Sequence, residues 1–146
     1  RTRQLGRGGA AGDGVEETKD MSAAPDFAGV TAALHLYFDG LYHCDTVRLA
    51  QVFHPTARYY CATEGRLLHL DMGQYFPIVD QRTSPASQGQ ARHDRILSVE
   101  FAGPVTAFAR VECAIAPRFF TDFLTLVRLD GNWQIVSKVF HFDRMG

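Results

Sequence analysis

The sequence predicts an α+β protein, in which a curved antiparallel sheet carries helices against one face. Helical spacing of apolar residues is confined to the first half of the chain, between residues 26 and 80. Four long runs rich in β-branched and aromatic residues fill the second half. The last two runs flank Asp130-Gly131, and this dipeptide between β-prone runs is the strongest short-range signal for a hairpin. A chain of 146 residues fits one domain.

The first 20 residues are predicted to be a disordered tail. They hold five of the 13 glycines and two large aliphatic residues, Leu5 and Val15. Such a segment cannot bury enough apolar surface to offset the entropy lost on ordering. We therefore expect a single domain over residues 21–146.

Three helices are predicted from their caps and periodicity. Asp26 is a candidate N-cap for the first, and Asp45 for the second, which stops near His54-Pro55 because the residue before proline disfavours the helical conformation. Asp71 followed by Gln74 resembles the capping box of a short third helix. The apolar face of the first helix is formed by Phe27, Val30, Leu34, Tyr37, Phe38 and Leu41.

The strands follow from runs of β-prone residues separated by turn signals. A short hairpin is predicted over Arg58–Thr63 and Arg66–Leu70, and a longer pair over Arg95–Phe101 and Val105–Ile115. The segment Phe119–Phe142 is expected to form the last hairpin.

The register of the last hairpin decides which side chains share a face. If Asp130-Gly131 form a two-residue loop, Asp122 pairs with Val139. Asp122 and His141 then lie diagonally on one face, and Lys138 lies on the other. Neither face is polar enough to be fully solvated. We expect helices on one face and the second subunit of a homodimer on the outer face.

Composition argues against several classes of protein. The net charge is −1 and no long basic run occurs, so nucleic-acid binding has little electrostatic support. The three cysteines and six histidines show no metal-binding spacing, and neither a metal nor a cofactor is expected. No run reaches the roughly 18 apolar residues of a membrane span. The N-terminus lacks the apolar core of a signal peptide, so a cytoplasmic location without membrane partners is expected.

Several motifs resemble a known superfamily. They are the segments Tyr37–Tyr42, Leu49–Pro55 with Ala57, Arg82 with Ser84-Pro85, and Thr121–Leu124 with Asp130–Val136 and Lys138–Phe140. Together with the element order, they resemble the nuclear transport factor 2-like superfamily, which includes ketosteroid isomerase, scytalone dehydratase and the SnoaL-like cyclases. More narrowly, they look like its putative lumazine-binding branch. The resemblance implies a cone-shaped roll, with a pocket between the concave face of the sheet and the helices.

Candidate catalytic residues are Asp122, His141 and Tyr37. If their face is concave, Asp122 could orient His141 for general acid–base catalysis while Tyr37 binds a developing oxyanion. The alternative is a structural pair or a solvated strand end. Alignment with ketosteroid isomerase places its carboxylate base at Cys61, and a neutral thiol is a poor substitute for a carboxylate.

Candidate ligand-binding residues are Tyr59, Cys61, Tyr75 and Arg82. Tyrosines suit a mainly apolar pocket with a few polar groups, although each could equally be core. Arg82 could neutralise an anionic ligand at the cavity mouth or fix its loop by bonding backbone carbonyls. We expect a protein that binds a small hydrophobic or aromatic molecule in an enclosed, mainly apolar pocket. The alternatives are a cofactor-independent lyase or isomerase and a dimeric protein-interaction module.

Overall fold

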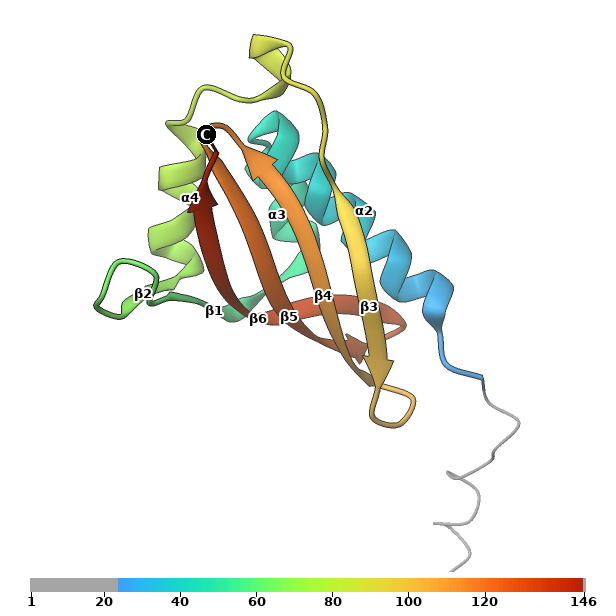
Figure 1. The fold of residues 1–146 in the computed structure, drawn as a ribbon. Helices are drawn as coiled ribbons and strands as arrows, with labels where there is room; N and C mark the ends of the chain where they lie inside the picture. Colours follow the sequence, from blue (N-terminus) through green and yellow to red (C-terminus); the bar gives the residue numbers. More distant parts are fainter. Residues whose placement is uncertain (1–23, 146) are drawn as a thin grey trace, which may run out of the picture.

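The structure, a computed structural model, describes residues 24–145 and consists of three α-helices against a six-stranded sheet (Figure 1). The predicted tail, residues 1–20, lies outside the described residues. The elements are α2 (Phe27–His43), α3 (Thr46–Val52), β1 (Phe53–Cys61), β2 (Leu68–Asp71), α4 (Met72–Asp80), the 3-10 turn η2 (Ala86–Gln88), β3 (Arg95–Phe101), β4 (Thr106–Ile115), β5 (Arg118–Leu129) and β6 (Asn132–Arg144).

The sheet has the strand order β2-β1-β6-β5-β4-β3 and does not close into a barrel. All neighbouring strands are antiparallel except β1 and β6, which run parallel. In Figure 1 the three helices lie on the same side of the sheet. The predicted α+β class, with a curved roll and helices on its concave face, is confirmed, with one parallel strand pair. No helix among residues 24–145 is long and apolar enough to span a lipid bilayer.

The predicted helix caps are confirmed. Asp26 accepts a hydrogen bond from the Gly29 amide at 3.0 Å, and its other oxygen accepts one from Trp133 Nε1 at 2.9 Å. This single carboxylate therefore starts α2 and ties it to β6. Asp45 caps α3, and Asp71 forms a capping box at the start of α4.

The last hairpin keeps the predicted turn and then changes register. Leu129 pairs with Asn132, as expected from the two-residue loop. Further along, Leu126 pairs with Ile135 and Thr125 with Ser137, which leaves Val136 as one extra residue in β6. This irregularity is a β-bulge, and it reverses the faces of all later β6 residues relative to β5.

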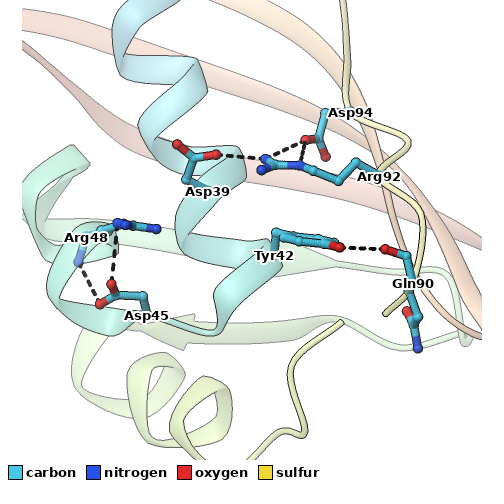
Figure 2. A network of polar contacts seen from close by, with 7 residues as sticks. All are labelled: Asp39, Tyr42, Asp45, Arg48, Gln90, Arg92 and Asp94. Atoms are coloured by element: carbon cyan, nitrogen blue, oxygen red, sulfur yellow. Dashed lines mark hydrogen bonds and ion pairs between the residues drawn. The ribbon is translucent and has the colours of Figure 1, made fainter. Parts of the chain in front are cut away.

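A long segment between α4 and β3 folds back over α2 (Figure 2). Within it, the Arg92 guanidinium forms ion pairs with Asp39 of α2 at 2.8 Å and with Asp94 at 2.7 Å. The Tyr42 hydroxyl donates to the Gln90 carbonyl at 2.6 Å, and the Arg92 guanidinium lies 4.6 Å from the Tyr42 ring centroid. These contacts hold the segment, which also contains Arg82, against the helical layer.

Candidate functional site

Two charged side chains are buried within residues 24–145, and both lie on the concave face of the sheet. Asp122 of β5 is 0% exposed and Lys138 of β6 is 4% exposed. Asp122 pairs with Phe140, and Lys138 pairs with Leu124. The two residues are therefore diagonal neighbours across β5 and β6, facing the helices.

Asp122 receives a short hydrogen bond from helix α2. The Tyr37 hydroxyl donates to Asp122 Oδ2 at 2.5 Å, and Tyr37 is itself fully buried. The second carboxylate oxygen, Oδ1, is buried and has no hydrogen-bond partner among the described residues. Asp122 thus has one oxygen that is hydrogen-bonded to Tyr37 and one oxygen that is available to accept a hydrogen bond or a proton.

Lys138 lies among aromatic rings rather than beside a carboxylate. Its Nζ lies 5.1–5.5 Å from the ring centroids of Phe140, Tyr37, Tyr59 and Tyr75. Ring faces attract a cation at such distances. In the described part of the chain, no carboxylate lies within the 4.0 Å of an ion pair with Lys138.

The environment shifts the acidities of these groups. Burial raises the pKa of Asp122, although Lys138 and the Tyr37 hydrogen bond oppose the shift. Burial lowers the pKa of Lys138, but the phenolic oxygen of Tyr75 and the carboxylate of Asp122 outweigh it, and the pKa rises above its ordinary value. Burial also raises the pKa values of Tyr37 and Cys113. The site therefore combines an ammonium that is favoured in its charged form with a diagonally placed carboxyl group that is more basic than usual.

A small cavity of about 10 Å³ opens beside Lys138. This volume suits roughly one water molecule. The predicted enclosed pocket is nearly filled by its own side chains, so a ligand needs some of them to move outward. The cavity is lined by Leu41, Tyr59, Arg82, Cys113, Ile115, Phe120 and Lys138.

Larger grooves lie elsewhere on the molecule. One of about 630 Å³ lies between α2, α3 and the turn at residues 129–134, and one of about 470 Å³ lies between α3, β1 and α4. Neither is lined by Asp122, Tyr37 or Lys138. We place the candidate site at the buried groups because reactivity depends on them and not on groove size. Within residues 24–145, no three His, Cys, Asp or Glu side chains cluster as metal ligands would.

The structure brings several of the predicted site residues together around Lys138. Tyr37 and Asp122 are hydrogen-bonded, Tyr59 and Tyr75 flank the Lys138 ammonium, and Arg82 lines the cavity. Cys61 is buried on β1, where its thiol donates to Thr63 Oγ1 at 3.4 Å, and it does not line the cavity.

The prediction that Asp122 and His141 lie diagonally on one face is wrong. His141 pairs with Thr121 and lies on the outer face, because the bulge at Val136 reverses the later part of β6. Its side chain is 58% exposed and bonds Thr63 Oγ1 at 2.8 Å and Asp143 at 3.0 Å. His141 therefore cannot transfer protons with Asp122 inside the fold.

Lys138 is the site residue that sequence reasoning missed. An uninterrupted register predicts Lys138 on the outer face, where a lysine needs no special explanation. A signal was nevertheless present in β6. The apolar positions are Trp133 and Ile135 in the first part of the strand, but Phe140 and Phe142 in the second. A change of phase within one strand is typical of a β-bulge, and it places Lys138 with the two phenylalanines.

A family model described as "Putative lumazine-binding" matches residues 25–141. The chain belongs to this family. The chain is also similar to "Aldolase FrzH" of Cladobotryum sp, with 30% identity over 118 residues, covering 80% of this chain and 90% of that protein.

Solved structures place this family member in the nuclear transport factor 2-like superfamily. An NTF-2 like protein of unknown function from Silicibacter pomeroyi DSS-3 has a TM-score of 0.67 and 28% identity, covering 80% of this chain and 94% of that one. An NTF2-like protein of unknown function from Shewanella baltica OS155 has a TM-score of 0.72 and 22% identity, covering 81% and 94%. The predicted superfamily and branch are confirmed.

Proposed function

We propose that this chain binds a small carbonyl compound in its interior and removes a proton from the carbon beside the carbonyl group. This step begins both aldol and isomerase reactions. The observation that carries the proposal is the buried set of Tyr37, Asp122 and Lys138. Asp122 supplies a carboxylate with one unpaired oxygen, Tyr37 donates a hydrogen bond to its other oxygen, and Lys138 supplies a buried ammonium.

A purely structural role for these groups explains little. Moving a carboxylate and an ammonium out of water is costly, and packed apolar residues of similar size are often as stabilising as a buried charged pair. Here the two charges do not form a direct ion pair, so their attraction offsets less of that cost. Perturbed ionisable groups of this kind cluster at functional sites.

Each group has a chemical task in the proposed step. Asp122 Oδ1 takes the proton, while the electrons of the broken C–H bond move to the carbonyl oxygen and form an enolate. The Lys138 ammonium stabilises that negative charge in surroundings of low dielectric constant. The enolate carbon then attacks a second carbonyl group in an aldol reaction, or it is reprotonated in an isomerisation. Tyr37 holds the carboxylate in place through Oδ2.

The environment of each group fits its task. A carboxylate whose pKa is raised is a stronger base at neutral pH. Lys138 is favoured in its charged form, and only a neutral amine attacks a carbonyl carbon. Lys138 is therefore assigned an electrostatic role. The 30% identity with a protein named an aldolase supports chemistry of this kind.

Hydrogen–deuterium exchange tests the proposal. A panel of linear, cyclic and aromatic ketones is incubated with the protein in D2O, and loss of the α-proton signals is followed by NMR. We expect exchange above the buffer rate for at least one ketone, and loss of that exchange in both Asp122→Asn and Lys138→Met. His141→Gln serves as the matched control because His141 lies outside the site. Exchange that survives Asp122→Asn would contradict the assignment of the base.

A second candidate function is binding without catalysis of a small hydrophobic or aromatic molecule. The aromatic rings around Lys138 and the family's description favour it. It predicts a ligand that raises the melting temperature while no ketone in the panel exchanges protons.

For the assembly, we propose a homodimer through the outer face of the sheet. Phe108, Phe123 and Val139 form an apolar stripe there across β4, β5 and β6, and each is more than a third exposed. The Phe108 and Phe123 rings lie 5.6 Å apart. Light scattering after gel filtration should show a dimer, and Phe123→Asp should give a folded monomer. A wild-type monomer at micromolar concentration would refute the dimer.

A further inference from the structure

We propose that the ligand of the interior site carries a carboxylate as well as its carbonyl group, and that Arg82 binds this carboxylate at the cavity. The inference deepens the proposed function and rests on it for the role of the carbonyl group. The recognition of the carboxylate depends on Arg82 alone and can be tested separately.

The wall of the cavity carries two cations, and no carboxylate lines it. Two of its seven lining side chains, Arg82 and Lys138, are cations, and the other five are apolar, phenolic or thiol groups. Asp122 does not line the cavity, although its charge acts on Lys138, so Arg82 is the cation of the wall that lacks a carboxylate partner among the described residues. A concave site with walls of low dielectric constant and one sign of charge attracts the opposite charge. The cavity therefore favours an anionic ligand.

Arg82 has its hydrogen-bonding groups available. It is half-buried, and in the described part of the chain its side chain forms no ion pair and no hydrogen bond. The sequence left open whether Arg82 fixes its loop by bonding backbone carbonyls, and the described structure shows no such bond. A guanidinium group matches a carboxylate with two parallel hydrogen bonds.

A second arginine in the same segment provides a contrast. Arg92 is more exposed than Arg82, and Asp39 and Asp94 occupy its guanidinium at 2.8 and 2.7 Å (Figure 2). Arg92 therefore fastens the segment to α2 with carboxylates that the protein supplies. Arg82, ten residues earlier, points to the cavity without a protein carboxylate, which is the arrangement expected of an arginine that serves a ligand.

The charge of Arg82 also reaches the buried groups. Burial raises the pKa of Tyr59, while Lys138 and Arg82 act in the opposite direction. The same two cations oppose the rise in the pKa of Cys113. Arg82 and Lys138 thus both act on groups that line the cavity. The proposed enolate needs only one of these cations, Lys138. A ligand with a second negative group gives Arg82 its partner.

Matched pairs of ligands test this inference. The probes are 2-oxobutanoate, 4-oxopentanoate and 5-oxohexanoate, each compared with its methyl ester, and binding is measured by titration calorimetry and ligand-observed NMR. We expect at least one acid to bind about tenfold or more tightly than its ester, as a charge-assisted pair supplies. Arg82→Met should reduce this preference to near one. Arg66→Met is the matched control, because Arg66 is exposed in the β1–β2 turn, and it should retain the preference.

Each outcome decides the inference. Equal binding of acids and esters, no binding of any acid, or a preference that survives Arg82→Met would overturn it. If an acid binds through Arg82 but no α-proton exchanges, carboxylate recognition stands and the proposed proton transfer fails. If acids and esters exchange equally and bind equally, the proton transfer stands and the role of Arg82 fails.

Discussion

Replacing Tyr37 by phenylalanine isolates the hydrogen bond at the centre of the site. The change removes one oxygen from a fully buried side chain and leaves the ring in place. Because Asp122 Oδ1 already lacks a partner, the variant leaves the buried carboxylate with no hydrogen bond among the described residues. Loss of a hydrogen bond to a charged group costs about 1.5–3 kcal/mol. For a chain of this size, 2 kcal/mol lowers Tm by roughly 6–8 °C.

Urea denaturation at pH 7 measures this cost, and Tyr75→Phe provides the matched control. Tyr75 is also buried, at 1% exposure, but its hydroxyl has no hydrogen-bond partner among residues 24–145. Its removal should not lower the free energy of unfolding and should raise it if anything, since no hydrogen bond is lost and an unsatisfied buried hydroxyl carries a desolvation cost. An equal cost for the two variants, at unchanged denaturant slope, would refute the assignment of the short Tyr37–Asp122 bond.

Three further predictions concern the buried charges of the site and the cap of α2. Lys138→Met should raise the pKa of Asp122 further, because the ammonium lowers it in the wild type, and NMR titration of the labelled carboxyl group would show the shift. The pKa of Asp122 in the folded state lies above its ordinary value of 3.8, so the folded state binds more protons than the unfolded state. The free energy of unfolding should therefore fall as the pH rises from about 4 through the folded-state pKa. Urea unfolding of Asp122→Asn should lack this fall. Asp26→Ala should cost about 1–2 kcal/mol and more than Asp45→Ala in urea unfolding, because Asp26 also binds Trp133.

The local structure was predictable because its causes are local. Capping by Asp26, Asp45 and Asp71 depends on a side chain and the amides two or three residues later, and all three caps form. The turn at Asp130-Gly131 also forms as expected, with both residues at positive φ. Alternation along a strand is local as well, and in β4 it puts Ala107, Ala109, Val111 and Cys113 in the core.

The arrangement of the site was less predictable because it depends on contacts between distant segments. Tyr37 and Asp122 are 85 residues apart, and no spacing rule relates them. The parallel pairing of β1 with β6 likewise joins the two halves of the chain. The position of Arg82 at the cavity depends on a segment that Arg92 fastens to α2, which is again a tertiary contact.

The bulge at Val136 determines which charged residue enters the interior. With continuous pairing, Trp133 and Ile135 would face the helices while Phe140 and Phe142 faced outward, exposing two large rings. One extra residue in β6 lets both halves of the strand place their apolar side chains on the concave face. The same shift carries Lys138 inward, because it shares the phase of the two phenylalanines, and carries His141 outward. The free energy gained by burying two aromatic rings can thus offset the cost of burying one ammonium. The chemistry of the site follows from a change of register at Val136, near the turn of the hairpin.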